Sequence, residues 1–594
     1  MKYVLVSGGV ISGVGKGIIA SSTGLLVKTR GSKVTMIKID PYMNIDAGTM
    51  APTEHGECFV LDDGGETDLD LGNYERYLNV TLSRDHNITT GKIYQHVINR
   101  ERRGDYLGKT VQIIPHLTDA LQDWLVRVAK LPVDDTKEQP DVCVIELGGT
   151  VGDIENAPFV EALRQLRRKA GSGNFLHIHV SMIPVINDEQ KTKPTQQTIK
   201  DVRSAGLNPD LIACRCKDRL MASTIEKVSM FCQVETDQVV AVHDVPSTYH
   251  VPMVLEKQGL INSLTKILQL DQLEIPSALR LRGAAIWEMW KISTSIQEHP
   301  QIVTIALVGK YTTSADSYIS VIKALEHSAM FCRRKLNLIM VDSSLLEEDD
   351  NKASSFESRK AWDTIRKADG VLVPGGFGTR GTEGMIAATR WARLNRVPFL
   401  GVCLGMQIAV IEYARNVCKL PGASSNEFDA QTVDPVIIFM PEIDSTSMGA
   451  TMRLGMRPTH FQPGTDWSQM RRLCRNSPAA ATKDTSDGLV IHERHRHRYE
   501  VNPVYVSELA SHGLNFVGKD DQGERMEILE LKDHPWFVGV QFHPEYLSKV
   551  LEPSRPYLGF FAASAGCLKE VIEKLESSKE DLENFSEAVK EANT

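Results

Sequence analysis

The feature that most constrains this fold is a pattern of strand, glycine loop and helix that occurs twice in the chain. Residues 2–31 read KYVLVSGGVISGVGKGIIASSTGLLVKTRG, and residues 302–329 read IVTIALVGKYTTSADSYISVIKALEHSA. Each segment begins with an apolar, β-branched run that suits a buried parallel strand, and then passes through glycine into a helical pattern. The sequence therefore predicts an α/β protein with two doubly wound domains.

The length agrees with two domains, because 594 residues are too many for one hydrophobic core. We expect a first domain over residues 1–278, a partly helical linker over 279–300 and a second domain over 301–566. Residues 567–594 are rich in charge towards their end and poor in core residues. They are expected to form a charged tail, which from Ser577 onward is either a solvated helix or disordered.

Composition and charge exclude several classes of protein. The net charge of −9 gives no overall basic field for nucleic acid or an anionic membrane, and no apolar run approaches the ~20 residues of a membrane span. The ten cysteines contain no CxxC pair, so we expect neither a disulfide framework nor a zinc site at Cys214 and Cys216. The opening MKYVLVSGG is too short for a signal peptide. These features predict a cytoplasmic protein.

The first glycine loop, SGGVISGVGKG, has the composition of a phosphate site. Its glycines surround Lys16 between a strand and a helix, where backbone N–H groups, a helix N-terminus and the lysine attract an anion. It departs from the standard P-loop, because Gly9 to Gly15 spans one residue too many and Gly17 replaces the hydroxyl residue that holds Mg²⁺. A glycine-rich turn alone is often only a turn, but this context favours phosphate binding.

Without the loop hydroxyl, acidic residues must hold the magnesium, because Mg²⁺ prefers hard oxygen ligands. Glu146 ends the apolar strand in DVCVIELGGT, and Asp70 lies in the polar segment DDGGETDLDLGNYER. The alternative for each is a solvated surface carboxylate, and for Asp70 taken alone that alternative is favoured. Lys38 and Asp40 end another strand in the same way. The stretch KTKPTQQTIKDVR from Lys191 suits either a triphosphate or an ordinary helix start.

The second candidate site centres on Cys403. GVCLG follows the strand VPFL and precedes the helix MQIAVIEYARNV, which is the nucleophile-elbow pattern with cysteine in place of serine. A helix N-terminus favours a thiolate, which also needs a base and an orienting group. WFVGVQFHPEY supplies His543 just after a strand and Glu545 two residues later. We therefore predict a Cys403–His543–Glu545 triad; the alternative is a buried inert cysteine and an ordinary His-Pro-Glu turn.

Hydrolysis of an amide also requires an oxyanion hole. VLVPGGFGTRG places Gly375 and Gly376 after another strand, and the N–H of Leu404 follows the nucleophile. The thiolate would attack a carboxamide carbon, release ammonia and leave a thioester for water.

Three histidines, His492, His495 and His497, lie close together in HERHRHRYEVNP. Such a set suggests a metal, but the intervening arginines would face the same ligand and oppose a cation. We favour a site for a carboxylate, with Arg498 as its clamp.

Nine motifs occur in order over residues 1–565: GGVISGVGKG, KIDPYMNIDAGTM, ERRGDYLGKTVQIIPH, ELGGTVGDIE, KTKPTQ, PGGFGTRG, GVCLGMQ, RHRHRYEVNP and QFHPEY. On these motifs the chain resembles the CTP synthase family in its eukaryotic-like form. The resemblance implies a P-loop amidoligase (synthetase) domain similar to dethiobiotin synthetase, followed by a class I glutamine amidotransferase domain. ATP would phosphorylate O4 of UTP, and ammonia from glutamine would displace the phosphate to give CTP, a step of de novo pyrimidine nucleotide synthesis.

The resemblance also assigns residues to sites. It implies ATP contacts at Gly13, Val14, Gly15, Lys16, Gly17, Ile18, Asp70, His243, Asp244 and Val245, with Mg²⁺ held by Asp70 and Glu146. It implies that UTP and the inhibitor CTP lie at Ser12, Asp153, Ile154, Glu155, Lys191, Thr192, Lys193, Pro194, Thr195, Gln196 and Lys227. Glutamine would contact Gly376, Leu404, Gly405, Met406, Gln407, Glu427 and Arg498, beside the catalytic Cys403, His543 and Glu545.

The family further implies GTP as an allosteric activator, an internal ammonia tunnel, a homotetramer built as a dimer of dimers, and in many members filaments. Two positions depart from its pattern: Asp188 replaces a glycine beside the pyrimidine nucleotide segment, and Cys58 replaces an aliphatic residue near the tunnel mouth at His55. The alternatives are another ATP-dependent amide synthase of the same plan and a filament-forming regulatory protein with inactive sites. KTKPTQ and ELGGTVGDIE disfavour the first, and the intact triad and Lys16 disfavour the second.

Overall fold

The computed structural model describes residues 1–9, 11–295, 301–347, 355–441, 452–475, 477, 480 and 488–576. The chain forms two compact units, the first from Met1–Ala47 and Thr67–Thr294, the second from Gly48–Glu66 and the residues from Ser295 onward. Residues 48–66 thus group with the second unit, although the sequence places them in the first domain.

Two other expected boundaries also differ from the structure. Most of the expected linker is a helix of the first unit, α11 (Ser277–Thr294), which buries Trp287 and Trp290. Residues 568–576, expected in the charged tail, are helical and bury Val571 and Ile572 in the core of the second unit. This helix packs in the core because its apolar side chains lie on one face, and charged residues on the other faces do not prevent that packing. Residues 296–300 of the expected linker and 577–594 of the expected tail lie outside the described residues.

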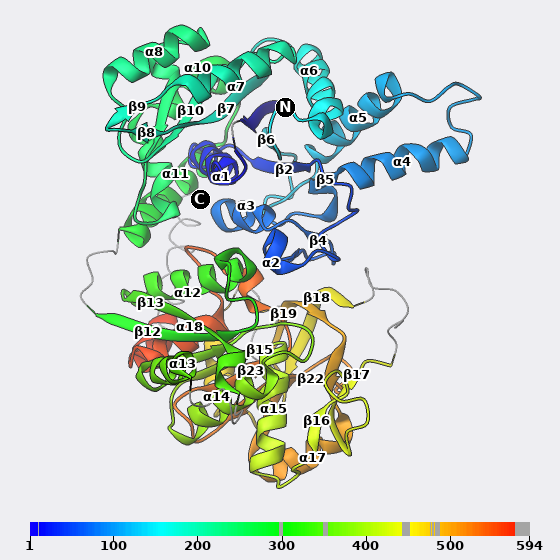
Figure 1. Ribbon diagram of the computed structural model, residues 1–594, viewed down its shortest axis with the longest axis vertical. Helices are drawn as coiled ribbons and strands as arrows, with labels where there is room; N and C mark the ends of the chain where they lie inside the picture. The colour runs from blue at the N-terminus through cyan, green and yellow to red at the C-terminus, as the bar shows by residue number, and fades with distance from the viewer. Residues whose placement is uncertain are drawn as a thin grey trace, which may run out of the picture. The chain divides into compact units, whose positions relative to one another are not determined.

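The first unit is built on a seven-stranded sheet in which every neighbouring pair is parallel (Figure 1). Its strands, in sheet order, are β11 (Val239–Val242), β10 (Leu211–Cys216), β7 (Phe175–Ile183), β1 (Lys2–Gly8), β6 (Val142–Leu147), β2 (Val34–Asp40) and β5 (Asn87–Thr89). Because β6, β1 and β7 are neighbours, the segments that follow them emerge at one edge of the sheet, where ligands of open α/β sheets bind.

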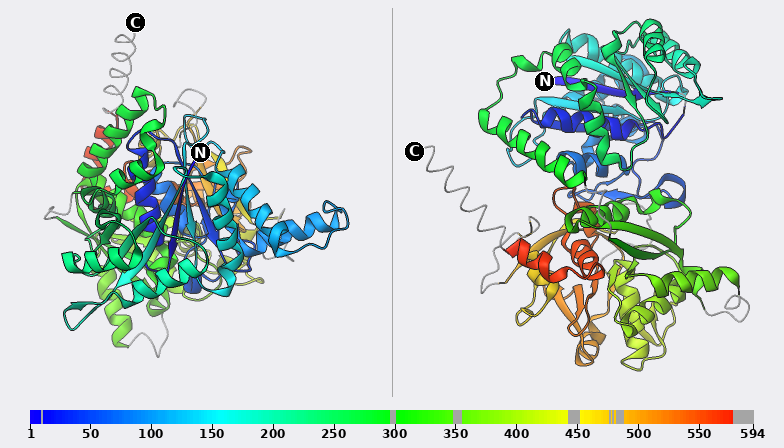
Figure 2. Two further views of the ribbon diagram at one scale, coloured as in Figure 1. Left: turned by 90° about the horizontal axis from the view of Figure 1, so that it is seen from above. Right: turned by 90° about the vertical axis from the view of Figure 1, so that its left-hand side faces the viewer.

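Helices cover both faces of this sheet. Leu5, Ile37 and Ile145 pack against Leu121 of α5 and Leu163 of α6 in one core cluster. The helices of this unit are α1 (Lys16–Lys28), α3 (Asp70–Leu78), α4 (Thr90–Arg102), α5 (Thr118–Val128), α6 (Ala157–Ala170), α7 (Lys193–Ser204), α8 (Ala222–Cys232), α9 (Val251–Lys257), α10 (Leu260–Leu268) and α11. Helix α4 and the loop after it project away from the sheet in both Figure 1 and Figure 2.

The second unit is built on a nine-stranded mixed sheet. In sheet order its strands are β13 (Lys335–Asp342), β12 (Ile302–Gly309), β14 (Gly370–Val373), β15 (Phe399–Val402), β23 (Phe537–Val540), β22 (Met526–Leu531), β21 (Leu514–Lys519), β18 (Arg453–Phe461) and β19 (Val490–His497). The pairs from β13 to β23 are parallel and those from β23 to β19 antiparallel. Two doubly wound α/β units therefore match the predicted fold class.

Successive side chains of β12 point to opposite faces of the sheet, and each face is covered by its own hydrophobic cluster. Ile305 and Leu307 face one cluster, and Ala306 and Val308 face the other, as the two-residue period of a strand requires. The helices are α2 (Pro52–His55), α12 (Ile319–Cys332), α13 (Phe356–Lys367), α14 (Thr382–Leu394), α15 (Leu404–Asn416), α16 (Gln469–Cys474), α17 (Pro503–Ser511) and α18 (Arg555–Ser564).

Short strands complete the fold. They are β3 (Phe59–Val60) with β4 (Glu66–Thr67), β8 (Val185–Ile186) with β9 (Glu189–Gln190), and a sheet of β16 (Ala423–Ser425), β17 (Asp434–Phe439) and β20 (Tyr499–Val501). Within the described ranges, no helix combines the length and apolarity needed to cross a bilayer.

Candidate active site

The turn between β15 and α15 places Cys403 at the N-terminus of a helix. Cys403 has φ 54° and ψ −104°, a left-handed backbone conformation that costs free energy for a side chain other than glycine. The turn is tight, because a Cβ at Gly401 would lie 2.5 Å from the carbonyl oxygen of Gly405. Cys403 thus has the strained strand-to-helix turn that a nucleophile elbow requires, and its position at the helix N-terminus favours a thiolate.

His543 and Glu545 lie beside this thiol. His543 Nδ1 is 2.8 Å from Glu545 Oε1, and the imidazole also hydrogen-bonds with Cys403. Tyr557 donates its hydroxyl to the other oxygen of Glu545 over 3.3 Å. The structure thus brings the three predicted triad residues together, with all three side chains buried.

Charge at this site favours a protonated imidazole. Burial lowers the pKa of His543, but the negative charges of Glu545 and Cys403 outweigh it and raise that pKa to about 10. An imidazolium beside the sulfur stabilises a thiolate and can later give its proton to a leaving amine.

The glycine loop after β14 lies directly against the triad. A Cβ at Gly375 would lie 2.8 Å from His543 Cε1 and 3.6 Å from the Cβ of Cys403. Gly375 and Gly376 line a small cavity of about 60 Å³ together with Cys403 and His543. The predicted oxyanion donors therefore lie beside the thiol that would attack.

Two charged side chains hold this loop, and sequence reasoning missed one of them. Lys310 donates its ammonium to the carbonyl oxygens of Phe377, at 3.2 Å, and Gly378. Glu427 accepts the N–H of Gly378 at 2.7 Å. Burial lowers the pKa of Lys310 to about 8 and raises that of Glu427. Lys310 directly follows β12, the first strand of its unit, and a charged residue at the end of a strand in an open α/β sheet is the signal that could have marked it as a candidate.

The remaining residues expected at glutamine are divided between the loop and the core. Gly376 lines the cavity, and the positive charge of Arg498 acts on Glu427. Gln407 instead donates to the carbonyl oxygen of Tyr499 at 3.0 Å. The residues Leu404, Gly405, Met406 and Gln407 are all buried in the first turn of α15, which begins directly after Cys403.

Side chains of the His/Arg stretch alternate along β19, with His495 and His497 bonded to each other and Arg494 and Arg496 paired with residues 48–66. His495 and His497 are buried with Nδ1 and Nε2 3.1 Å apart, and burial lowers the pKa of His497 to about 3, so it stays neutral. Arg494 pairs with Asp62 at 2.6 Å and Arg496 with Glu66 at 2.9 Å. The arginines thus bind carboxylates of residues 48–66, which explains why this segment belongs to the second unit.

In the first unit, the acidic residues converge on the glycine loop. A Cβ at Gly17 would collide with Asp70 Oδ1 and lie 3.5 Å from Glu146 Oε2. Lys38 lies between them, ion-paired to Asp70 and 3.2 Å from Glu146 Oε1, with Asp40 3.6 Å away. Burial raises the pKa of Glu146, the charge of Asp70 adds to this, and Lys38 opposes it.

The carboxylates of Asp70 and Glu146 lie at Gly17, the position at which a standard P-loop carries a hydroxyl residue. Such a set of hard oxygen donors fits Mg²⁺. Among the described residues, no group of three or more His, Cys, Asp or Glu side chains forms a ready metal cluster. Lys16 donates to the carbonyl oxygen of Gly149 at 2.7 Å, and Gly13 and Gly15 have φ 71° and 96°. The loop therefore has the left-handed glycines that expose N–H groups to a phosphate.

The other expected ATP residues, His243 to Val245, follow β11 at the same edge of the sheet. Asp244 is ion-paired with Arg215 of β10. β11 is three strands from β1, so His243 to Val245 are not adjacent to the glycine loop through strand pairing.

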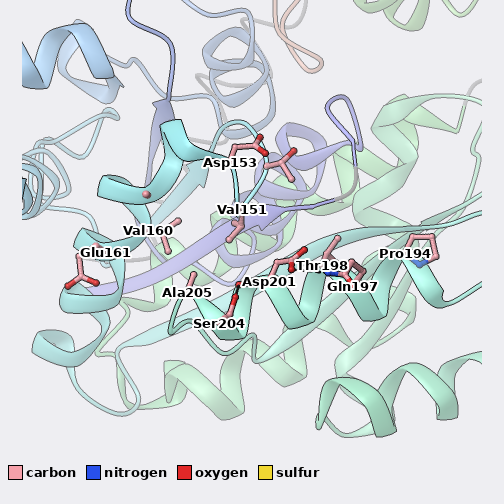
Figure 3. A pocket seen from close by; sticks show the side chains of 13 residues that line it. Val151, Asp153, Val160, Glu161, Pro194, Gln197, Thr198, Asp201, Ser204 and Ala205 are labelled. Carbon is pink, nitrogen blue, oxygen red and sulfur yellow. Dashed lines mark hydrogen bonds between the residues drawn. The ribbon is translucent and has the colours of Figure 1, made fainter.

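The residues expected at UTP and CTP are only partly brought together. A cavity of about 780 Å³ is lined by Asp153 and Val151 on one side and by α7 residues, including Pro194 and Thr198, on the other (Figure 3). Ile154 is 85% exposed, and Ser12, Glu155, Lys191 and Lys227 do not line this cavity. Thr192, Lys193, Thr195 and Gln196 belong to the first turn of α7 or its cap.

The two residues that depart from the family pattern, Asp188 and Cys58, lie in a tight turn and beside the Cys403 cavity, respectively. Asp188 has φ 59° in the β8–β9 turn, a left-handed conformation that favours glycine and that aspartate tolerates at some cost. Cys58 is buried and lines the cavity that contains Cys403.

Comparison with known proteins covers nearly the whole chain. The family model described as CTP synthase N-terminus matches residues 2–270, and that of glutamine amidotransferase class-I matches residues 313–563. CTP synthase 1 of Saccharomyces cerevisiae is 61% identical over 586 residues, 98% of this chain and 99% of the relative. The CTP synthase of Schizosaccharomyces pombe is 61% identical over 589 residues, 99% of this chain and 96% of the relative.

Among solved structures, the glutaminase domain of Trypanosoma brucei CTPS with bound acivicin is 37% identical, with a TM-score of 0.39, covering 44% of this chain and 94% of that chain. The two fungal relatives are each 61% identical to this chain and align over nearly its full length, and this decides the family. The chain belongs to the CTP synthase family.

Proposed function

We propose that this chain converts UTP to CTP, with ATP as phosphoryl donor and ammonia released from glutamine in the second unit. Identity of 61% to a fungal CTP synthase over 98% of the chain carries this proposal. The two candidate sites supply the matching chemistry: a thiol elbow for an amide and a glycine loop with carboxylates for a nucleotide.

Glutamine hydrolysis uses the Cys403 triad. The thiolate attacks the carboxamide carbon, and the N–H groups of Gly376 and Leu404 stabilise the oxyanion. The imidazolium of His543 gives its proton to the departing ammonia, which its raised pKa of about 10 permits at neutral pH. His543 then takes a proton from the water that opens the thioester, and Glu545 holds the ring throughout.

The amidoligase step uses the first unit. The loop N–H groups and Lys16 bind the phosphates of ATP, and Asp70 and Glu146 would hold Mg²⁺, which would neutralise phosphate charge. The γ-phosphoryl group passes to O4 of UTP, and ammonia displaces the phosphate. Lys38 lies between the two carboxylates and offsets part of their negative charge. UTP and the inhibitor CTP bind along residues 153–155 and 191–196, with Ser12 and Lys227, and His243 to Val245 contact ATP.

Regulation and assembly are also proposed. GTP activates glutamine hydrolysis by acting on the loop that Lys310 and Glu427 hold, and ammonia reaches UTP through an internal tunnel near Cys58. The projecting α4 and its loop expose Ile98 at 56% and Leu107 at 90%, which suits a buried contact in a homotetramer and in filaments. Ten reduced cysteines are typical of a reducing compartment, which supports a cytoplasmic location.

Conversion of UTP tests the proposal. Purified protein is incubated with UTP, ATP, Mg²⁺, GTP and glutamine, and CTP is measured by chromatography. The expected result is CTP formation that needs every substrate and also proceeds with ammonium in place of glutamine. Glutamine hydrolysis without CTP from either nitrogen source would show that the acceptor is not UTP, as in another amide synthase of the same plan.

A further inference from the structure

Two cysteines far from Cys403 in sequence meet at the end of the second unit's core. Cys332 ends α12, and Cys567 follows α18 after Gly566, which has φ 70°. Both belong to one core cluster, with exposures of 8% and 6%, and their thiols hydrogen-bond to each other. This contact joins residues 235 positions apart in the chain, so it depends on the fold rather than on a local turn.

Charges around the pair favour a thiolate at one of the two sulfurs. The hydrogen bond from Cys332 lowers the pKa of Cys567 to about 7 despite its burial, and the positive charge of Arg334 lowers it further. The same hydrogen bond raises the pKa of Cys332. The ammonium of Lys574 lies 4.5 Å from the centre of the Phe331 ring and adds positive charge near Cys332. Cys567 is therefore the more acidic of the two thiols, and Cys332 is in contact with it, as a resolving thiol must be.

The last described helix depends on this region for its anchorage. Residues 568–576 begin directly after Cys567, and Val571 and Ile572 enter the core cluster that contains Cys332. The N–H of Val571 donates to the carbonyl oxygen of Cys567 at 3.1 Å, so the helix starts from the cysteine itself. A covalent bond at Cys567 would fix the first turn of this helix to the end of α12.

We propose that Cys332 and Cys567 are a reversible oxidation site whose disulfide anchors residues 568–576 to α12. The oxidant is a small peroxide. The Cys567 thiolate attacks one oxygen of hydrogen peroxide, the O–O bond breaks, and the released hydroxide takes a proton to become water, leaving a sulfenic acid. Cys332 then attacks that sulfur, the S–O bond breaks, and the Cys332 proton leaves with the hydroxide as a second water. A dithiol returns both thiols by exchange.

Mapping of disulfides in the full-length protein tests this site. The protein is treated with hydrogen peroxide, free thiols are alkylated, and the non-reduced digest is analysed by mass spectrometry. The expected result is a cross-linked peptide joining Cys332 to Cys567 that disappears after dithiothreitol, and slower deuterium exchange over 568–576 in the oxidised protein. Separately alkylated Cys332 and Cys567 peptides, or bonding of either to another cysteine, would overturn the proposal.

Variants separate the roles of the two sulfurs. Cys332→Ser should form no cross-link and should accumulate a sulfenic acid at Cys567, which dimedone labels, whereas Cys567→Ser should give no dimedone label at Cys332. Cys418→Ser is the matched control, because Cys418 is 7% exposed in the other core cluster, and it should cross-link like the wild type. A dimedone label at Cys332 in Cys567→Ser, equal to that at Cys567 in Cys332→Ser, would contradict the assigned order.

Discussion

Replacement of Glu545 by glutamine tests the electrostatics of the triad. Glu545 accepts from His543 at 2.8 Å and is the first charge that raises the pKa of His543 against its burial. Glutamine keeps the size of the side chain and an oxygen acceptor but removes the negative charge. The imidazolium of Glu545→Gln should therefore lose its proton at lower pH than in the wild type.

The size of this effect follows from the geometry. Two opposite charges about 4 Å apart attract by about 4 kcal/mol at the effective dielectric of about 20 that suits protein sites. Since about 1.4 kcal/mol is a tenfold change, the protonation equilibrium of His543 should change by about a thousandfold. The wild-type imidazolium persists up to its raised pKa of about 10, so glutaminase activity that needs it is lost only above that pH. In Glu545→Gln the loss on the alkaline side should begin near neutral pH.

The assay is the pH dependence of kcat/KM for glutamine hydrolysis, which reports groups of the free enzyme. Glu530→Gln is the matched control, because Glu530 is similarly buried but is bonded to Ser468 rather than to the triad. Its alkaline limb should coincide with that of the wild type. An unchanged alkaline limb in Glu545→Gln, or an equal displacement in Glu530→Gln, would refute the reasoning.

Three further substitutions have expected outcomes. In Gly375→Ala the new Cβ lies 2.8 Å from His543 Cε1, so glutamine hydrolysis should fall by about 100-fold or more while ammonia-dependent synthesis persists; steady-state kinetics with both nitrogen sources measures this. In Gly17→Ala the new Cβ collides with Asp70, so synthesis from either nitrogen source should be lost, as a CTP assay would detect, and normal synthesis would contradict the site. Trp290→Ala empties a buried ring position beside Tyr249, which should cost the first unit about 3–5 kcal/mol of unfolding free energy. Denaturant unfolding followed by circular dichroism measures that loss, and a change below about 1 kcal/mol would contradict the packing.

Local sequence patterns predicted the parts of the sites that depend on neighbouring residues. The Cys403 elbow and the glycine loop are strand-to-helix turns, so their glycines and the following helix are visible in a few residues. The His-x-Glu spacing likewise places His543 and Glu545 on one short turn. Parallel strand ends also meet at one sheet edge in any doubly wound fold, which explains why Glu146, near the end of β6, could be placed at this edge from the sequence, whereas Asp70, at the start of α3, could not.

Contacts between distant segments could not be read in this way. Residues 48–66 pair with β19 through Arg494 and Arg496, and only the folded chain brings Asp62 and Glu66 to them. The Lys310 contacts with the Phe377 loop are of the same kind. The expected start of the tail at residue 567 also differs from the structure, because Val571 and Ile572 give residues 568–576 an apolar face that packs in the core.

The central claim is that one chain carries two separable activities, ammonia release at Cys403 and nucleotide amination at Lys16. The most direct measurement is CTP formation from UTP by Cys403→Ala and Lys16→Ala, each supplied with glutamine and GTP or with ammonium. Cys403→Ala should lose glutamine-dependent synthesis and keep ammonia-dependent synthesis, and Lys16→Ala should lose both. Loss of both activities in a folded Cys403→Ala protein, or glutamine-dependent synthesis that survives the removal of its thiol, would contradict the account.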